Sequence, residues 1–229
     1  MYRVVVACVA LLALAGGSVA EAQPAPYYQP GPAYNPIYSW TGFYVGINGG
    51  YGWGTSTWSL VPTANNKPKG WLAGGTVGYN YQTGSIVWGI EGDFDWSNVK
   101  GSATCAPGVT CSTEDRWLAT VRGRLGYAFD RWLPYITGGG AMGNVRASIN
   151  VPAFGFMDSA SKNLWGWTIG AGLEYAFMSN WSAKLEYLYV DLGSFNTGPL
   201  PLVNNVSFKE NIVRAGLNYK FSGPIFSHY

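Results

Sequence analysis

The sequence predicts an all-β fold, an eight-stranded antiparallel up-and-down transmembrane β-barrel whose apolar face points outward. Three observations predict it: polar and apolar residues alternate along the chain, only 11% of the residues are charged, and 16% are aromatic. The alternation is clearest over residues 86–96, where Trp88, Ile90 and Phe94 share one face of an extended chain and Glu91 and Asp93 share the other. A soluble domain carries about 25% charged residues, whereas a membrane barrel turns its apolar face to lipid.

The ends of the chain are predicted to lie outside the barrel. Residues 1–22 read as a signal peptide, with Arg3, a short apolar core and an Ala20-Glu21-Ala22 cleavage site, or Ser18-Val19-Ala20 as an alternative. Residues 23–39 are a Pro/Tyr-rich linker, which we expect to be extended and periplasmic. Residues 40–221 are the barrel, and residues 222–229 are a C-terminal tail.

The strands are expected to be joined alternately by short turns and long loops. We expect strands over residues 42–54, 70–82, 86–96, 115–129, 133–146, 164–177, 181–191 and 210–221. Tight turns are expected at 82–85, 130–131 and 178–180, and long loops at 55–69, 98–114, 147–163 and 192–209. Short turns at one rim and long loops at the other, with an even strand number, predict both termini in the periplasm of a Gram-negative bacterium.

The fifth predicted strand has a weak pattern because it contains many glycines. We place Tyr135, Ala141 and Val145 outward, since this turns Arg146 inward, and the opposite register stays open. The inward face of the fourth strand is expected to hold Arg116 as well as Arg122 and Arg124, which come after it at the same spacing.

Charged residues on the inward faces predict a paired network in the lumen. The expected members are Glu91, Asp93, Glu174 and Glu186 facing Arg122, Arg124, Lys184 and Arg214. Neighbouring strands would bring Glu91 and Asp93 to the two arginines of the fourth strand, and a paired buried network is tolerable where a lone charge is not. Since eight strands leave little free space, we expect the network to close the lumen. The alternative is a small porin that passes low-mass solutes.

Other motifs point away from catalysis. Gly138-Gly-Gly-Ala-Met-Gly143 matches a dinucleotide pattern, but no helix is expected after it, so barrel packing explains it better. The single histidine, His228, lies in the tail, which argues against a Ser-His-Asp site. We expect no enzymatic activity, metal or cofactor, and the net charge of +2 predicts no nucleic-acid partner. Cys105 and Cys111 are expected to form a local disulfide in an oxidising compartment.

Six segments resemble the small outer-membrane β-barrel family of alpha-proteobacteria, often called outer-membrane immunogenic or porin-like proteins. The segments are Trp40–Trp53, Gly74–Gln82, Arg122–Tyr127, Pro134–Gly139, Gly170–Tyr175 and Val213–Phe221. The resemblance covers Trp40 to Phe221 and implies a barrel of the OmpA or OmpX type without enzymatic activity.

The resemblance also implies an assembly signal in the last strand. Its residues would be Ala215, Leu217, Tyr219 and Phe221, although residues 222–229 follow them. The implied location is the outer membrane. The expected partners are outer-membrane lipid, the outer-membrane assembly machinery, and an unidentified extracellular partner that binds the loops.

Overall fold

The structure is a computed structural model that describes residues 38–58, 64–106, 108–151, 156–195 and 206–221. The predicted signal peptide, most of the predicted linker, the tail and His228 lie outside these residues. The strands are β1 (Gly42–Trp58), β2 (Ala64–Asn66), β3 (Lys69–Thr83), β4 (Ile86–Ala106), β5 (Val109–Tyr127), β6 (Trp132–Val151), β7 (Phe156–Ala176), β8 (Trp181–Phe195) and β9 (Val206–Lys220). In this described part, no helix has the length and apolar composition needed to cross a bilayer.

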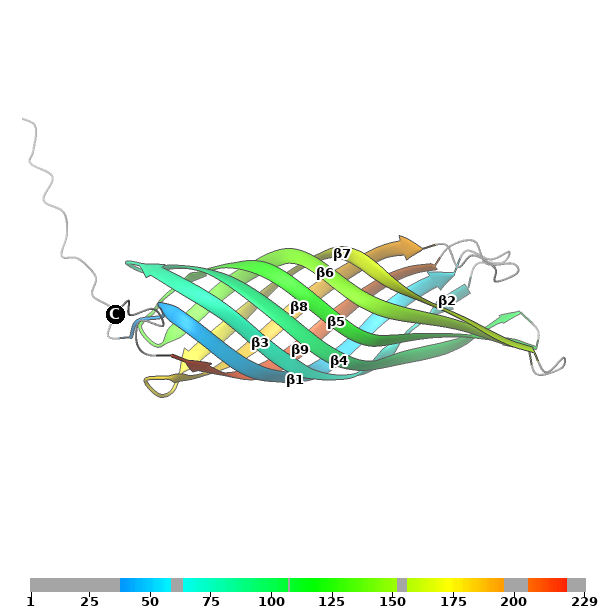
Figure 1. Cartoon of the computed structure of the whole chain (residues 1–229), viewed down its shortest axis with the longest axis horizontal. Helices are drawn as coiled ribbons and strands as arrows, with labels where there is room; N and C mark the ends of the chain where they lie inside the picture. Colours follow the sequence, from blue (N-terminus) through cyan, green and yellow to red (C-terminus); the bar gives the residue numbers. More distant parts are fainter. Residues whose placement is uncertain (1–37, 59–63, 107, 152–155, 196–205, 222–229) are drawn as a thin grey trace, which may run out of the picture. The chain divides into compact units, whose positions relative to one another are not determined.

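The strands form one antiparallel sheet that closes on itself (Figure 1). Each strand from β3 to β9 pairs with the next along the chain, and β1 pairs with both β3 and β9. The closing pair runs from Tyr44 opposite Lys220 to Trp58 opposite Val206. The short β2 pairs only with the far end of β1, so β1 and β3–β9 make the eight-stranded barrel that the sequence predicts.

The polarity of the barrel is inverted relative to a soluble protein. Apolar side chains on one face of each strand point outward, and Val121 and Trp165 are 63% and 76% exposed. Charged residues on the other face point inward, and Arg122, next to Val121, is 1% exposed. Because side chains alternate between the two faces of a strand, the period-two pattern of the sequence sets this arrangement.

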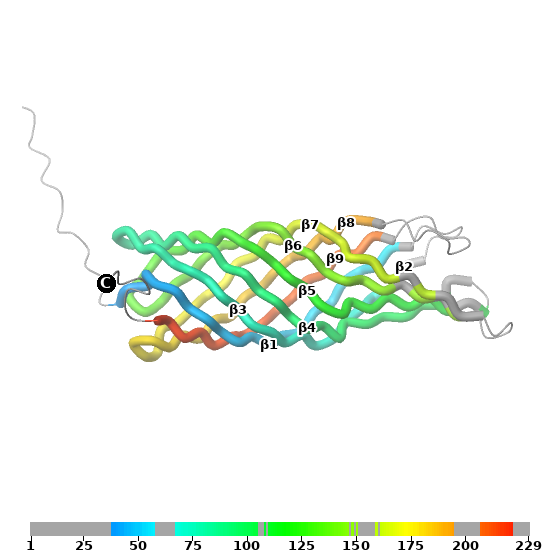
Figure 2. Tube along the Cα trace, in the orientation of Figure 1, coloured from blue at the N-terminus to red at the C-terminus, as the bar shows by residue number. Residues whose placement is uncertain are grey.

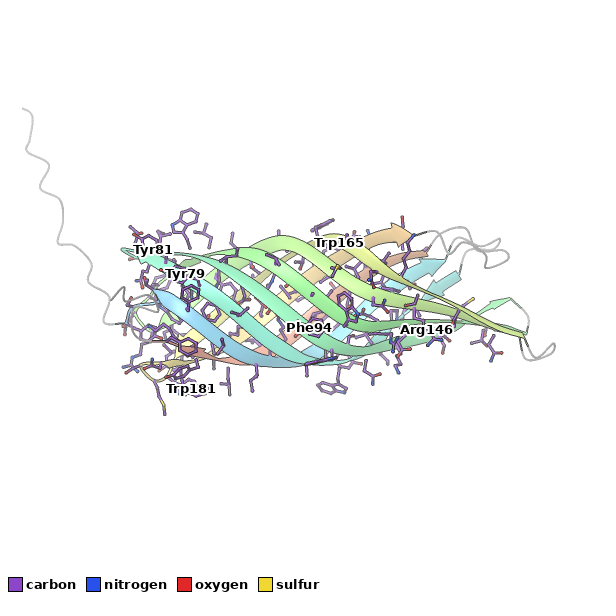
Figure 3. All side chains as sticks on the ribbon, viewed as in Figure 1. Tyr79, Tyr81, Phe94, Arg146, Trp165 and Trp181 are labelled. Atoms are coloured by element: carbon purple, nitrogen blue, oxygen red, sulfur yellow. The ribbon has the colours of Figure 1, made fainter. Side chains whose placement is uncertain are left out.

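Aromatic side chains gather in two bands on the outer wall. In Figure 3, Tyr79, Tyr81 and Trp181 lie toward one end, whereas Phe94 and Trp165 lie about midway along the cylinder, before the strands extend further. Neighbouring rings touch within each group; the ring centroids of Trp132 and Tyr175, for example, are 4.4 Å apart, and other aromatic pairs lie at similar distances. Two aromatic girdles of this kind mark the membrane–water interfaces of a membrane barrel.

The two ends of the barrel differ in their connections. One end, called the turn end here, carries the predicted short turns, which place Gly84 and Asp130 at positive φ values of 60° and 54°. The opposite end, called the loop end, carries the longer connections. There the predicted loops over 98–114 and 147–163 are wrong in large part, because β4 continues to Ala106 and β7 begins at Phe156. Figure 2 shows β4, β5, β6 and β7 running furthest in this direction.

The end of the β4 extension was missed because its residues are polar or small. The stretch Gly101-Ser-Ala-Thr-Cys-Ala106 pairs with β5, with a register shift between Thr104 and Ala106, but shows no contrast between an apolar and a polar side. Alternation of hydrophobicity arises only where one face meets lipid and the other does not. Beyond the aromatic girdle this contrast ends, although the hydrogen-bonded ladder continues.

The predicted register of residues 133–146 is also wrong. Tyr135, Ala141 and Val145 point inward and are nearly fully buried, whereas Ile136 and Arg146 are exposed. The pairing with β5 requires this, since Ile136 lies opposite the outward Leu125. The whole of Gly138–Gly143 lies within β6, where no helix follows it, as the sequence predicts.

A second correction concerns Arg116, which is exposed rather than inward. The pairing of β5 with β6 shifts between Asp115 and Leu118, and the pairing of β4 with β5 shifts between Trp96 and Val99. A β-bulge adds a residue to one strand and changes which side chains point inward. As a result Asp115 takes the buried position.

The turn end is covered by residues that precede β1. Trp40 is buried there against Val87, Leu133 and Ala176, and its indole N–H donates to the carbonyl of Asp130 at 3.1 Å. Tyr38 joins this cluster, with the Lys220 ammonium 4.1 Å from its ring centroid. Burial raises the pKa of Tyr38 to about 12, which keeps its hydroxyl neutral.

The outward face predicts a test of the membrane assignment. Val121 lies on β5 between the girdle residues Trp117 and Tyr127. Val121→Arg places a cation in the hydrocarbon. The free energy of unfolding of the variant in lipid vesicles should therefore be about 2–4 kcal/mol lower than that of the wild type. Urea titration followed by tryptophan fluorescence measures this, with Ser179→Arg in an exposed turn as the control. Equal losses in the two variants would contradict the assigned facing.

Candidate functional site: the charged lumen

The lumen of the barrel is filled with charged side chains from five strands. The eight charged residues that the sequence predicts to be inward are each at most 6% exposed. They are Glu91 and Asp93 of β4, Arg122 and Arg124 of β5, Glu174 of β7, Lys184 and Glu186 of β8, and Arg214 of β9. The structure brings all of them into one connected network.

Arg122 lies at the centre of the network. Its Nη2 is 2.5 Å from Glu91 Oε1 and 2.6 Å from Asp93 Oδ2, and its Nη1 is 2.9 Å from Glu186 Oε1. Its Nε donates to Thr120 Oγ1 at 3.1 Å. Because Glu186 belongs to β8 and Glu91 to β4, the guanidinium joins strands that do not neighbour each other in the sheet.

Arg214 makes a second crossing of the lumen from β9. Its Nη1 donates to Asp95 Oδ2 and its Nη2 to Asp93 Oδ1, both at 2.8 Å. Its Nε donates to Glu186 Oε2, also at 2.8 Å. The two arginines therefore share Asp93 and Glu186, and their planar groups satisfy several carboxylate oxygens at once.

Arg124 occupies the part of the lumen nearer the turn end. Its guanidinium carbon is 3.9 Å from the ring centroid of Tyr135 and 5.9 Å from that of Tyr44. Its Nη2 donates to Glu174 Oε2 at 2.7 Å, and the Tyr44 hydroxyl donates to Glu91 Oε2 at 2.7 Å. Stacking and charge pairing together hold this side chain in place.

Glycines make room for the two lumen tyrosines. A Cβ atom at Gly78 would lie 2.4 Å from the Tyr44 ring, and one at Gly172 would lie 2.5 Å from the Tyr135 ring. Real Cβ atoms do not approach other atoms so closely, so the absence of a side chain at these glycines leaves the space that the rings occupy. The glycine-rich strands thus let large side chains fill a barrel of only eight strands.

Lys184 and Glu174, the remaining predicted members of the network, do not pair with each other although they face each other across two strands. Lys184 and Glu174 lie opposite each other on β8 and β7. The Lys184 ammonium nevertheless lies 3.0 Å from Glu91 Oε2. Glu174 accepts hydrogen bonds from Ser182 at 2.5 Å and from Asn218 at 2.8 Å, in addition to its contact with Arg124.

Three further buried carboxylates were missing from the predicted network: Asp95, Asp115 and Glu210. Asp95 follows Asp93 at the spacing that puts both on one face, so the sequence held a signal for it. Asp115 is inward because of the bulge in β5, which the sequence does not reveal. Tyr44 and Tyr135 were also missed, because the sequence does not distinguish an inward tyrosine of the lumen from an outward tyrosine of the aromatic girdle.

Asp115 and Glu210 lie on the loop-end side of the network. Within the described residues neither forms an ion pair, and Asp115 Oδ1 and Glu210 Oε1 have no hydrogen-bond partner. At about this level Ser56 Oγ and Thr113 Oγ1 lie 3.2 Å apart, joining β1 to β5 across the interior. Inside the barrel, polar contacts thus continue toward the loop end beyond the last ion pair of the lumen network.

The described residues offer little to other chemistry. No group of three or more metal-ligating side chains in them is arranged to hold a metal ion. Cys111 is disulfide-bonded, while the side chain of Cys105 lies outside the described part, so the pairing of the two stays a prediction. The proposed assembly signal lies on β9 and just after it, where Ala215, Leu217 and Phe221 are exposed, and its role is likewise a prediction.

The network predicts a large difference between buried and exposed ion pairs. Arg122→Met removes one of the two guanidinium groups that Asp93 and Glu186 share. It leaves a buried negative charge uncompensated, which should lower the free energy of unfolding by about 3–5 kcal/mol. Lys209→Met breaks the pair between Lys209 and Asp191 on the outer surface, where the lysine side chain is 52% exposed. That loss should be at most about 1 kcal/mol.

Urea unfolding in lipid vesicles measures both variants. A loss for Arg122→Met no larger than that for Lys209→Met would contradict the importance of the buried network.

Comparison with known proteins identifies the family. Residues 9–221 match the model of the outer membrane protein beta-barrel domain. The chain is 37% identical to a 31 kDa outer-membrane immunogenic protein of Brucella melitensis, over 96% of this chain and 100% of that protein. It is 34% identical to a 22 kDa outer membrane protein of Rhizobium leguminosarum, over 81% of this chain and 80% of that protein.

Among solved structures, OprG from Pseudomonas aeruginosa matches with 16% identity and a TM-score of 0.47, over 80% of this chain and 97% of that one. Ail from Yersinia pestis matches with 17% identity and a TM-score of 0.41, over 78% and 99%. The residues that match the family model include every strand that builds the barrel. The chain belongs to the outer membrane protein beta-barrel domain family.

Proposed function

We propose that this chain is a non-enzymatic protein of the Gram-negative outer membrane with a structural or surface-interaction role, and that charge pairs close its lumen. The observation that carries the proposal is the crossing of the lumen by Arg122 and Arg214. Each of these buried guanidinium groups binds carboxylates from both β4 and β8. Such bonds span the space through which a solute would have to pass.

The network would also be hard to open. Arg122, Arg214, Glu91 and Glu186 are each about 1% exposed. Breaking one pair leaves an uncompensated charge in a poorly hydrated interior, which costs several kcal/mol. Tyr38 and Trp40 add a second barrier at the turn end, where they are packed against Leu133 and Ala176. A rigid closed cylinder is therefore favoured over a small porin.

The surface-interaction role rests on the loop end. β4, β5, β6 and β7 extend furthest there, and the described contacts of this part are polar, such as Asn144 with Asn163 at 2.7 Å and Arg146 with Ser159 at 3.0 Å. A rigid scaffold that holds polar extensions outside the membrane suits recognition. In this proposal the loop end is extracellular, both termini are periplasmic, and an unidentified extracellular partner binds the loops.

The non-enzymatic part of the proposal rests on how the lumen carboxylates are held. Glu91 and Asp93, the pair that most resembles an acid/base site, both contact Arg122. Both carboxylates are occupied by the guanidinium group and are closed off from solvent, so a substrate could not reach them. The relatives are named as outer-membrane or immunogenic proteins, and these names state no activity.

The closed lumen predicts an electrical result. Purified protein inserted into planar bilayers should give no steady unit conductance, because the ionic bonds of Arg122 and Arg214 fill the lumen. Steady, uniform current steps would overturn the closed lumen and favour the porin. The same samples are checked for folding by gel electrophoresis, where an unheated barrel in detergent should migrate differently from a boiled one. Absence of conductance supports the proposal when the same protein shows this migration shift.

A further inference from the structure

Among the described residues, the lumen holds more buried carboxylates than buried cations. Seven acidic side chains are nearly fully buried there, against four basic ones. The acidic set is the four carboxylates of the predicted network together with Asp95, Asp115 and Glu210, and the basic set is Arg122, Arg124, Lys184 and Arg214. If every group were ionised, three negative charges would remain uncompensated in a poorly hydrated interior, which is very costly. The imbalance therefore requires positive charge from protons or from a bound cation.

The uncompensated carboxylates are Asp115 of β5 and Glu210 of β9, which we call the acidic pair. Asp95 is held by Arg214, whose Nη1 lies 2.8 Å from its Oδ2. Neither member of the acidic pair forms an ion pair within the described residues, although each is only 1% exposed. Asp115 Oδ1 and Glu210 Oε1 also have no hydrogen-bond partner there. Two buried oxygens thus point to a ligand that neutralises them.

Opposite walls of the barrel approach each other beside the acidic pair. Ser56 Oγ of β1 and Thr113 Oγ1 of β5 lie 3.2 Å apart in the interior. Thr113 comes two residues before Asp115 and so shares its inward face. Ser56 lies opposite Phe208, which comes two residues before Glu210 on β9. The acidic pair therefore occupies the adjoining inward positions, and Asp115 is close enough to repel Glu210.

The residues opposite the acidic pair in the sheet carry no charge. They are Val99 of β4 and Val145 of β6 beside Asp115, and Gly54 of β1 and Val190 of β8 beside Glu210. The three valines are fully buried. Asp115 has hydrogen bonds with the Ser97 side chain and the Arg116 backbone, but both of these groups are neutral. An ionised carboxylate here would face apolar side chains and backbone without a counter-charge.

Charged groups on the inner face do not compensate the acidic pair. Asp95 repels both of its members. The Arg214 guanidinium, four residues along β9 from Glu210, is bound to Asp95 and to carboxylates of the network. On β7, Lys162 shares the inner face because it lies opposite Val145, but its side chain is exposed. The charge of this lysine is therefore solvated and acts weakly.

Charged groups on the outer face are separated from the acidic pair by the sheet. They are Glu114 and Arg116 beside Asp115, Lys209 beside Glu210, and Lys100, Arg146 and Asp191 on adjoining strands. Glu114 pairs with Lys100 at 2.8 Å, and Asp191 with Lys209 at 3.3 Å. Solvent and salt screen charges in such positions, so the inner carboxylates keep their need for a counter-charge.

A proton fits the acidic pair better than a metal ion does. In the part of the chain that the structure describes, no group of three or more metal-ligating side chains is arranged to hold a metal ion. A proton needs no shell of ligands, and it converts a carboxylate into a neutral acid that can donate a hydrogen bond. Where two carboxyl groups share a dry site, ionisation of one opposes ionisation of the other, so that one proton is retained.

We propose that the acidic pair is a proton-binding site that retains at least one proton at neutral pH, and that release of this proton loosens the loop end. Loss of the proton to a base in the solvent leaves two carboxylates repelling each other among buried valines. Water must then enter to solvate them, at the expense of the packing around Val99 and Val145. This inference goes beyond the proposed function, because it requires neither a closed lumen nor an extracellular partner.

The retained proton links folding to pH with a definite sign. In the unfolded chain a carboxyl group loses its proton near about pH 4, so at higher pH the folded barrel binds more protons than the unfolded chain. Stability falls with rising pH wherever the folded state binds more protons. The unfolding equilibrium constant should therefore rise up to about tenfold per pH unit for each retained proton, until the folded pair is ionised as well.

The test compares the wild type with the double variant Asp115→Asn/Glu210→Gln, whose side chains keep their shape but cannot ionise. The control is Glu114→Gln, because Glu114 is next to Asp115 but belongs to the outer face, where it pairs with Lys100. Each protein is folded into phosphatidylcholine vesicles and unfolded with urea at pH values from about 5 to 9, a range above the ordinary titration of carboxyl groups.

The urea midpoints of the wild type and the control should fall together as the pH rises, whereas that of the double variant should fall less, so that it is the most stable of the three at the highest pH. The same pH dependence in all three proteins would overturn the proton site. So would a rise of the wild-type midpoint on addition of calcium that the double variant lacks, because the acidic pair would then hold a metal ion.

Infrared spectroscopy tests the site without any unfolding step. A protonated carboxylic acid has a carbonyl stretching band separate from the bands of a carboxylate, and exposed carboxyl groups are ionised at neutral pH. The folded wild type and the control should show this band at neutral pH, and it should disappear as the pH is raised. The double variant should lack it. A wild type without the band would overturn the proposal even if the double variant failed to fold.

The predicted loosening is measured by hydrogen exchange. As the infrared band disappears, the protection factors of backbone amides around Asp115 and Glu210 should fall in the wild type, while those at the turn end and those of the double variant stay unchanged. Constant protection at the loop end would overturn the loosening. Steady conductance at neutral pH would overturn the closed lumen of the proposed function and would leave the proton site standing.

Discussion

Closure of the sheet is the constraint on which the rest of the structure depends. In hydrocarbon no water can satisfy a free N–H or C=O group, so a β-sheet can cross a bilayer only if its first and last strands pair. Here β1 meets β9 along their whole length, from Tyr44 opposite Lys220 to Trp58 opposite Val206. Closing only eight strands fixes a narrow cylinder, and a narrow cylinder has a dry interior that must be filled by side chains.

The contents of that interior follow from two demands. The outward residues must be apolar, and alternation leaves the inward positions to polar side chains or glycine. Polar side chains in a narrow space then have to satisfy each other, which is what Arg122 and Arg214 do by sharing Asp93 and Glu186. A connected network of this kind is rigid, because each carboxylate of Asp93 and Glu186 is held by two guanidinium groups at once. In the proposed function, the same bonds that stabilise the cylinder also close it to solutes.

Most of the strands could be predicted from the sequence because lipid imposes a sharp contrast between neighbouring residues. The eight charged residues that this contrast assigned to the inward faces are buried in the structure. The prediction failed where that contrast is missing. In β6 the row Gly138-Gly139-Gly140 has no side chains to show a face, and the register was decided wrongly from Arg146. Arg146 is exposed because it lies beyond the aromatic girdle, where a cation may face outward. The bulge beside Asp115 depends on pairing with neighbouring strands, so no local pattern announces it.

At the loop end, buried acidic residues and exposed cations are neighbours along the same strand. Asp115 points inward and its neighbour Arg116 outward, and Glu210 and Lys209 repeat the arrangement on β9. The inner carboxylates lack ion-pair partners within the described lumen, whereas the outer cations exceed their acidic neighbours. A carboxylate in a poorly hydrated interior is costly without a cation, whereas an exposed cation at the membrane surface is solvated and gains little from an acidic partner. Pairing therefore limits which charges the inner face can hold, while solvation sets no such limit on the outer face of the same strands.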